Sequence, residues 1–386
     1  MSEGRLRVGY IPLVDAAVLI VAADKGFAAA EGLDIDLVRE VSWSNVRDKL
    51  NIGLFDAAHL LSPVAVASSL GIGHVRVPLV VPYNLGLNGN AITVAPALLR
   101  ALADEADGDV SDPTVSARAL ARVVARRRAR GHGILTFGMT FPFSNHNYQL
   151  RFWMAAGGVD PDEDVRLVVL PPPYMVESLA GGHVDGFCVG APWNSVAVNI
   201  GVGCILHFGC DIIARCSEKV LAVRGEWAAK NAEVVHKLVR ANSRAAGFIA
   251  QEANREDVAG LVAARIGVKP EVIRRTLAGT LRLARGGPER VSDRYLLIGR
   301  DGARPDPMQA AWLYAQMVRW GQAAMSPDLL AAARAVFRPD LFDAALGGDP
   351  VRDGDAPADR IGAFAGPAFN PDRIAVDITR WAIRRA

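Results

Sequence analysis

The chain has 386 residues, and its 43 basic and 41 acidic side chains leave a formal charge of +2. Hydrophobic residues make up 51% and charged residues 22%, a composition that excludes an intrinsically disordered chain. The near-neutral balance excludes the broad cationic field that binds duplex nucleic acid, so we expect no direct nucleic-acid contact. At roughly 100–200 residues per domain, the length predicts two domains or one bilobal unit.

The N-terminal residues carry no targeting pattern. Met1–Gly4 leads directly into the alternating stretch Leu6–Ile11, without a basic segment, an apolar core, a small-residue cleavage site or a lipidated cysteine. No window reaches the roughly 18 uninterrupted apolar residues of a membrane-spanning helix. We therefore expect a cytoplasmic location and no membrane contact.

Short apolar runs alternate with helical patterns in the first quarter of the chain, which is typical of a parallel or mixed α/β sheet. The predicted strands are Leu6–Ile11, Leu33–Arg39, Ala57–Leu61, Val77–Val81 and Ala91–Val94. Helices are predicted at Ala16–Lys25 and Asn45–Ile52. Each follows a side chain, Asp15 or Ser42, that can cap free N–H groups.

An arginine-rich stretch precedes the next set of strands. Val115–Arg130 carries six arginines in sixteen positions. An RNA- or partner-binding helix is one reading, but we interpret the stretch as a solvated amphipathic helix, because a lone charge run usually lies on the surface. Strands are then predicted at Leu135–Met139, Val165–Leu170, Val184–Val189 and Cys204–Phe208, with helices at about 147–156, 174–180 and 193–198.

The order of these elements predicts two lobes. One α/β lobe opens, is interrupted by a second, and resumes with a mainly helical C-terminal extension after Val223. We assign residues 1–94 and 220–386 to lobe I and residues 95–219 to lobe II. The expected fold is α/β, bilobal, with a ligand cleft between the lobes.

Motifs for catalysis, phosphate binding and metal binding are missing from the sequence. There is no G-x-S-x-G elbow, phosphate-binding G-x-x-x-x-G-K-[ST] loop or H-E-x-x-H motif. The run from Leu85 to Asn90 lacks the third glycine and the following helix of a nucleotide motif. The four cysteines have no C-x-x-C spacing and the seven histidines do not cluster, so we expect no metal and no cofactor. The sequence favours binding over turnover.

Three polar residues stand out as candidates for a binding site. Among 43 basic residues only six are lysines, and Lys219 is the only one between Lys49 and Lys230. The chain otherwise uses arginine in this region, and the compact ammonium of Lys219 fits a small pocket better than a planar guanidinium does. His146 opens a helix just past a strand, where free N–H groups attract anions. Trp43 lies at another strand-to-helix turn, where its indole can wall a pocket and donate.

Several segments resemble the nitrate/bicarbonate-binding proteins of ABC importers, a family with the bilobal type II periplasmic-binding-protein fold. These segments are Gly9–Leu13, Ser42–Lys49, Asn88–Thr93, Leu170–Leu179, Val184–Asn194 and Ser217–Leu221. The resemblance covers about residues 5–225 and is weaker in the helical remainder.

The resemblance implies a nitrate site made of Trp43, Asn90, His146 and Lys219, with Pro172 shaping its wall. Lysine would supply the full charge, and the indole, amide and imidazole would supply directed donors to a small planar anion. At Asn90 a longer glutamine would also suit the role. Nitrite would use nearly the same donors, whereas bicarbonate would also want an acceptor for its hydroxyl.

Because no export leader is recognised at the N-terminus, two main functions are considered, a cytoplasmic sensor and an importer binding protein. A cytoplasmic member of this group resembles the NasS-type nitrate/nitrite sensors, which hold an ANTAR-domain antiterminator without ligand and release it when nitrate or nitrite binds. The resemblance thus implies such a sensor, controlling nitrate assimilation. The alternative is an importer binding protein whose signal sequence lies outside the sequence considered. An enzyme related to the thiamine-pyrimidine synthases is the third possibility, but Gly186–Gly190 has one cysteine where those enzymes have a cysteine-rich motif.

Overall fold

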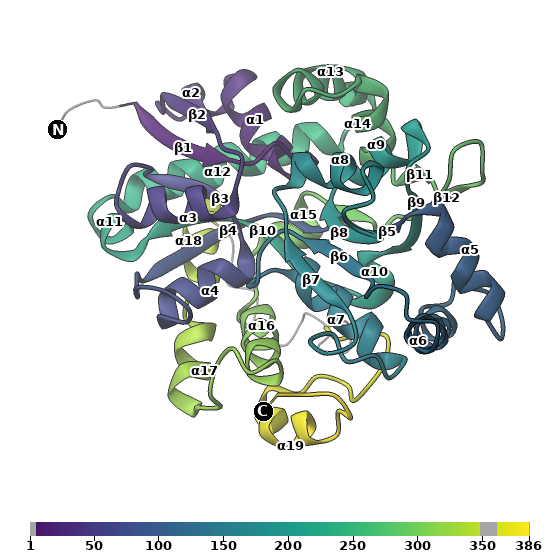
Figure 1. Cartoon of the computed structure of the whole chain (residues 1–386). Helices are drawn as coiled ribbons and strands as arrows, with labels where there is room; N and C mark the ends of the chain where they lie inside the picture. The colour runs from purple at the N-terminus through teal and green to yellow at the C-terminus, as the bar shows by residue number, and fades with distance from the viewer. Residues whose placement is uncertain (1–4, 348–360, 386) are drawn as a thin grey trace.

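The computed structural model describes residues 5–347 and 361–385, whose strands form two main sheets (Figure 1). The six-stranded sheet contains, in spatial order, β13 (Leu296–Leu297), β4 (Leu79–Asn88), β10 (Ser217–Arg224), β3 (Ala57–Leu61), β1 (Leu6–Tyr10) and β2 (Ile35–Arg39). The five-stranded sheet contains β7 (Arg166–Val169), β6 (Thr136–Met139), β8 (Gly186–Gly190), β5 (Asn90–Val94) and β9 (Cys204–Phe208). A hairpin of β11 (Thr280–Arg282) and β12 (Glu289–Val291) stands apart.

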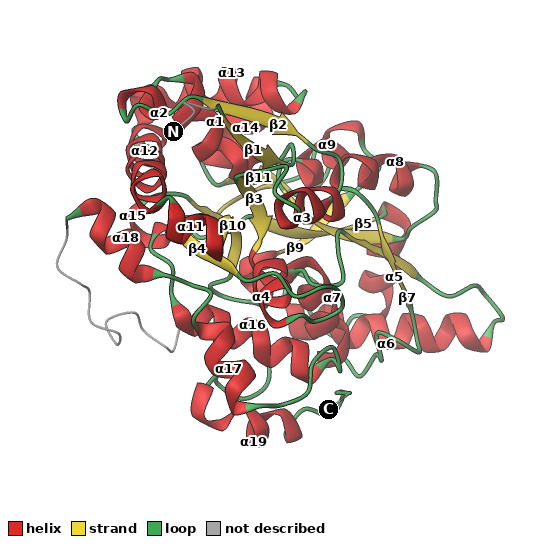
Figure 2. Cartoon of the chain, turned by 90° about the vertical axis from the view of Figure 1, so that its left-hand side faces the viewer, coloured by secondary structure: helices red, strands yellow, loops and turns green. Residues whose placement is uncertain are grey.

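Helices surround both sheets (Figure 2). Those of the first two thirds of the chain are α1 (Ala17–Asp24), α2 (Phe27–Ala30), α3 (Trp43–Asn51), α4 (Ser62–Leu70), α5 (Pro96–Glu105), α6 (Pro113–Ala129), α7 (Asn145–Ala156), α8 (Met175–Ala180), α9 (Trp193–Ile200), α10 (Gly209–Ile212), α11 (Gly225–Lys230) and α12 (Ala232–Ala250). The others are α13 (Arg255–Ile266), α14 (Pro270–Leu277), α15 (Arg300–Ala303), α16 (Pro307–Arg319), α17 (Pro327–Arg334), α18 (Pro339–Leu346) and α19 (Ile374–Thr379). Short 3-10 turns include η1 (Val14–Ala16) and η2 (Pro172–Tyr174).

The predicted strands are present within one or two residues, with one exception. Val77–Val81 was expected as a short strand, but β4 extends from Leu79 to Asn88. The extension follows from pairing, because β4 bonds to β10 on one side and β13 on the other. The glycine-containing run from Leu85 to Asn88 therefore forms the end of this strand.

The two predicted helix caps have different outcomes. Ser42 caps α3, with its side chain accepting from the N–H of Asn45. Asp15 caps no helix: it lies inside η1, and α1 begins without a side-chain cap. The Asp15 carboxylate instead contacts His59 and Lys219.

The chain crosses between the sheets at two neighbouring points. Asn88 and Gly89 both have left-handed backbone conformations, with φ of 60° and 91°, and they turn the chain from β4 into β5. Glycine adopts this conformation without steric cost. Asn88 Oδ1 accepts from the Cys216 N–H at 2.9 Å, just before the chain enters β10. This contact ties the two crossings together.

The predicted lobe boundaries need correction by this topology. Residues 90–94 were placed in lobe I, but β5 pairs with β8 and β9 in the second sheet. Residues 217–219 were placed in lobe II, but they begin β10 in the first sheet. Residues 1–4, 348–360 and 386 of the predicted lobe I lie outside the described residues.

The C-terminal residues also pack differently from the prediction of a lobe I extension. Phe152 of α7 stacks on Trp312 of α16 at 5.7 Å between ring centroids and meets Trp381 edge-on at 5.2 Å. The C-terminal end of the chain therefore lies against a helix of the second lobe, below α16 in Figure 1. Sequence periodicity cannot indicate which lobe such a segment contacts.

The arginine-rich stretch forms α6, and five acidic or carbonyl groups around it bind its arginines. Arg118 forms a bidentate pair with Asp107, and Arg128 bonds to Asp164 at 2.7 Å. This agrees with the surface interpretation. In the described parts of the chain, no helix is both long and apolar enough for a bilayer crossing.

Candidate functional site: a closed charged cluster between the sheets

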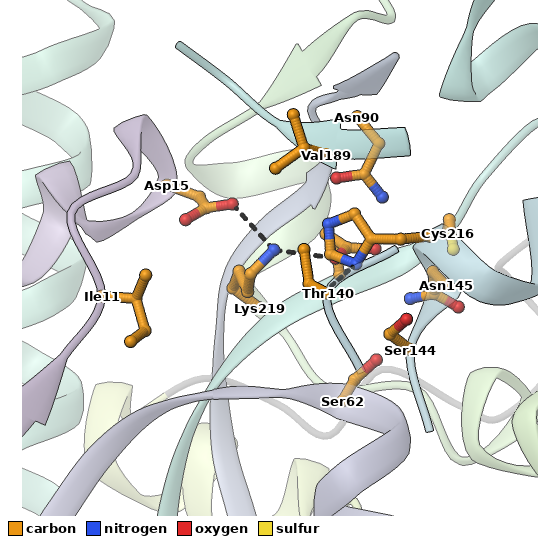
Figure 3. Close-up of polar contacts among 12 residues, drawn as sticks. Ile11, Asp15, Ser62, Asn90, Thr140, Ser144, Asn145, Val189, Cys216 and Lys219 are labelled. Atoms are coloured by element: carbon orange, nitrogen blue, oxygen red, sulfur yellow. Dashed lines mark hydrogen bonds and ion pairs between the residues drawn. The ribbon is translucent and has the colours of Figure 1, made fainter. Parts of the chain in front are cut away.

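The site is built from the ends of elements that meet between the two sheets. From the six-stranded side come Asp15 of η1, His59 of β3 and the pair Glu218 and Lys219 of β10. His146 comes from the first turn of α7, which follows β6 of the other sheet. Figure 3 shows Asp15 and Lys219 pointing toward each other across this junction.

Lys219 is paired with two carboxylates. Its Nζ donates to Glu218 Oε1 at 2.7 Å and lies 3.2 Å from Asp15 Oδ2. The ammonium also lies 5.4 Å from the centroid of the Trp43 ring. Lys219 and Glu218 are completely buried and Asp15 is 2% exposed. The charge that the sequence assigned to an anion is thus already balanced within the protein.

A strand irregularity brings Glu218 and Lys219 to the same place. Neighbouring side chains on a regular strand point to opposite faces. The pairing of β10 with β4 shifts register between Ser217 and Lys219 and again between Lys219 and Val220. Such a bulge changes the direction of the side chains, and here the two charged groups come within hydrogen-bond distance.

His59 orients Asp15. The Ile11 N–H donates to His59 Nδ1 at 3.4 Å, so Nε2 carries the hydrogen and donates to Asp15 Oδ1 at 2.9 Å. Burial would raise the pKa of Asp15, but Lys219 and His59 outweigh burial and hold this pKa below its usual value. Asp15 therefore stays ionised at neutral pH.

Burial would lower the pKa of Lys219, but Asp15 and Glu218 outweigh it and raise this pKa above its usual value. The ammonium therefore keeps its charge although it is completely buried. This stabilisation depends on both carboxylates, and removing either one would weaken it.

His146 is the imidazole of the site that has one ring nitrogen, Nε2, without a described hydrogen bond. Its Nδ1 lies 2.9 Å from Thr140 Oγ1, and its Nε2 lies 3.5 Å from Glu218 Oε1. Burial lowers the pKa of His146 to about 4, with Glu218 opposing part of the effect. The ring is therefore neutral at pH 7.

Several buried polar atoms of the site have no hydrogen-bond partner among the described residues. They are Trp43 Nε1, His146 Nε2 and Glu218 Oε2. An unpaired buried polar atom is costly, and such atoms in a native protein call for an explanation. The indole nitrogen is a donor, the carboxylate oxygen is an acceptor, and the imidazole nitrogen can be either. This set suits a small polar ligand with several oxygens.

Asn90 takes part differently from the prediction. Its Nδ2 donates to Gln149 Oε1 of α7 at 3.1 Å, while its Oδ1 is without a partner in the described chain. The amide group is thus shared with the neighbouring glutamine, which the sequence interpretation missed. We expected that a glutamine could replace Asn90 in this role. Gln149 instead lies on α7, 59 residues further along the chain, so sequence spacing could not pair it with Asn90.

Pro172 begins η2, beside α8, and no described hydrogen bond or ring contact joins this turn to Lys219. Its role in the pocket wall stays a prediction. The structure brings together Trp43, His146 and Lys219. It adds Asp15, His59 and Glu218. Two of these could be suspected from the sequence, because Glu218 adjoins Lys219 and Asp15 follows the first strand.

The cluster is closed to solvent. Trp43 is 1% exposed and His146 is fully buried. Two backbone-linked contacts seal it: Val14 N–H donates to Ala191 O at 2.9 Å, and Asn145 Nδ2 donates to Ser217 O at 2.7 Å. Both contacts join the two lobes across the cluster.

The buried histidines predict that the ligand-free protein loses stability in mild acid. His146 and His207 both have pKa values of about 4 in the folded protein, against roughly 6.5 in an unfolded chain. Below about pH 6.5 the unfolded state therefore binds more protons, and stability falls until the pH reaches the folded values, by about 1.4 kcal/mol per pH unit for each histidine. Urea unfolding between about pH 7 and pH 5 measures this. A flat profile would mean that these rings are charged in the native state.

Comparison with known proteins places this geometry in a defined class. The crystal structure of the periplasmic nitrate-binding protein NrtA from Synechocystis superposes with a TM-score of 0.85 and 26% identity, covering 98% of both chains. The predicted fold class is thereby confirmed: the chain has the bilobal fold of periplasmic binding proteins. A profile of the NMT1-like family matches residues 2–263, and the chain belongs to this family.

Its curated relatives are named for nitrate, nitrite or bicarbonate. The nitrate/nitrite binding protein NrtA of Synechococcus elongatus is 31% identical, over 95% of this chain and 83% of its own length. The bicarbonate-binding protein CmpA of Synechococcus sp. is 27% identical, over 99% and 87%. The nitrate import ATP-binding protein NrtC of Synechocystis is 31% identical over the whole chain, but the chain spans only 56% of its length.

Proposed function

We propose that this protein binds a small planar monovalent oxyanion, of the nitrate and bicarbonate kind, as the solute-binding component of an ABC-type importer. The observation that carries the proposal is the closed cluster between the lobes. There the Trp43 indole, the His146 imidazole and the Glu218 carboxylate each have a buried polar atom without a described partner. The names of the relatives support the same ligand class.

The cluster also corrects an expectation about the ligand. The sequence interpretation had no clear acceptor for the hydroxyl of bicarbonate. Glu218 Oε2 is such an acceptor, fully buried beside Lys219. Bicarbonate therefore joins nitrate and nitrite as a candidate on geometric grounds.

Binding proceeds through lobe closure in this proposal. The open form exposes the cluster to the anion, and the closed form surrounds it with groups from both sheets. The ligand stabilises the closed state relative to the open one. The transmembrane components of the importer can therefore distinguish the ligand-bound protein by its closed conformation. The hinge consists of the two crossings joined by Asn88 and Cys216.

Thermal unfolding with a panel of anions tests the proposal. A ligand that binds only the folded state stabilises it by about 2.7 kcal/mol at a hundredfold excess over Kd. At least one of nitrate, nitrite and bicarbonate should raise Tm, whereas chloride and sulfate at equal ionic strength should not. Equal shifts from all five anions would indicate a general salt effect and contradict the proposal.

The sensor function, the ANTAR-domain antiterminator and the cytoplasmic location stay predictions. Two of the relatives are named for nitrate import and for bicarbonate transport, and this favours the importer interpretation. Co-purification with the antiterminator, with and without nitrate, separates the two: a sensor would release its partner when nitrate is added.

A further inference from the structure

The charge balance of the cluster sets a condition on any anion that binds there. Asp15 and Glu218 face one ammonium, Lys219, and the neutral His59 and His146 rings complete the set. The thiols of Cys188 on β8 and Cys216, which interact with the same charges, have pKa values raised well above normal by burial and stay neutral. Two carboxylates against one ammonium leave an excess of one negative charge.

A second negative charge in this enclosed place is strongly unfavourable. Charges interact far more strongly in a protein interior than in water, and a like charge a few ångströms away disfavours the charged form of an ionisable group. Nitrate bound beside Trp43 and Lys219 would lie close to Glu218, whose Oε1 is already 2.7 Å from Lys219 Nζ. A proton is the smallest group that restores the balance.

His146 is the group best placed to take that proton. Both ring nitrogens of His59 are engaged, by the Ile11 N–H and by Asp15. His146 Nε2 is without a described partner and faces Glu218 Oε1 at 3.5 Å. An added proton would give the His146 ring an N–H on both nitrogens, with Nδ1 next to Thr140 and Nε2 next to Glu218, and the charged ring would pair with Glu218. Lys219, still paired with Asp15, could then face the anion.

We infer that this site binds its anion together with one proton, and that Glu218 is the residue that imposes the coupling. With nitrate or nitrite the proton comes from solvent and is held on His146. Bicarbonate carries the same single negative charge, so it too binds with a proton held on His146, and its hydroxyl donates in addition to Glu218 Oε2. The inference rests on the proposed function and adds to it the identity of a second ligand, the proton.

Titration calorimetry in two buffers of different ionisation enthalpy tests the coupling. Nitrate binding should take up close to one proton from the buffer, and its affinity should fall about tenfold per pH unit between about pH 6 and pH 8, because the bound state holds a proton that the free state lacks. Bicarbonate binding should also take up about one proton, because bicarbonate carries the same charge as nitrate. Nitrate binding with no buffer-dependent heat and no pH dependence would overturn the inference while leaving the proposed function intact. If neither anion gives any heat, both fail.

Glu218→Gln gives a second, independent test. Glutamine keeps an oxygen for Lys219 but removes one negative charge and the acceptor Oε2. The variant should bind nitrate about tenfold more tightly at about pH 8, with little proton uptake, whereas the loss of the acceptor should cancel this gain for bicarbonate. Glu226→Gln removes an exposed carboxylate that pairs with Lys230, and it should change neither affinity. If Glu218→Gln weakens nitrate and bicarbonate alike, the residue merely supports Lys219 and the coupling is wrong.

Discussion

Replacing Lys219 with methionine should lower the free energy of unfolding by about 3–5 kcal/mol, because the change leaves two buried carboxylates without their cation. Asp15 and Glu218 both contact the ammonium, and neither carboxylate can reach water in the closed structure. Anion binding should be lost in the same variant. Chemical unfolding and anion titration measure the two effects separately.

The pH dependence of this loss identifies its cause. Protonation neutralises an unpaired carboxylate, so the destabilisation should be largest at about pH 8 and smaller at about pH 5. Lys230→Met is the matched control. Lys230 pairs with Glu226 on the surface, where the side chains are 69% and 80% exposed, and its removal should change stability by less than about 1 kcal/mol. Equal effects of the two substitutions would mean that the buried pair contributes little.

The second large effect is expected at Gly157, which ends α7. A Cβ added there would lie 2.0 Å from the Ala117 carbonyl oxygen and 2.3 Å from its carbon, both of them backbone atoms of α6. Because backbone cannot rotate away as a side chain does, the two helices must separate. Gly157→Ala should therefore cost roughly 3 kcal/mol of stability. It should also weaken anion binding, since α7 carries His146 in its first turn.

Gly260→Ala controls for the general effect of the substitution. Gly260 lies within α13, where an added Cβ meets nothing within 4 Å. Alanine favours the helix over glycine by up to about 1 kcal/mol, so this variant should be slightly more stable than the parent. Comparison of the two unfolding curves isolates the clash between α6 and α7. A Gly157→Ala protein as stable as the parent would show that the helices can move apart freely.

Local pattern in the sequence was enough to predict most of the fold. Short apolar runs mark the strands Ala57–Leu61 and Cys204–Phe208, which the structure places at the predicted residues. The order of elements also predicted two α/β lobes with a helical end, because strand and helix periodicities are local properties of the chain. Lys219 and His146 were identified as candidates from residue type and position, and both lie in the cluster.

Only the tertiary structure decided what surrounds those two residues. Asp15 has the position of a helix cap in the sequence, yet it pairs with Lys219 and His59 because η1 is packed against β3 and β10. Glu218 should point away from Lys219 on a regular strand, and the register shift against β4 turns it inward. The sequence by itself indicated a candidate site that contains a lysine and a histidine. Its charge balance was decided by residues that are distant in the sequence, because electrostatic interactions in a protein interior depend on distance in space.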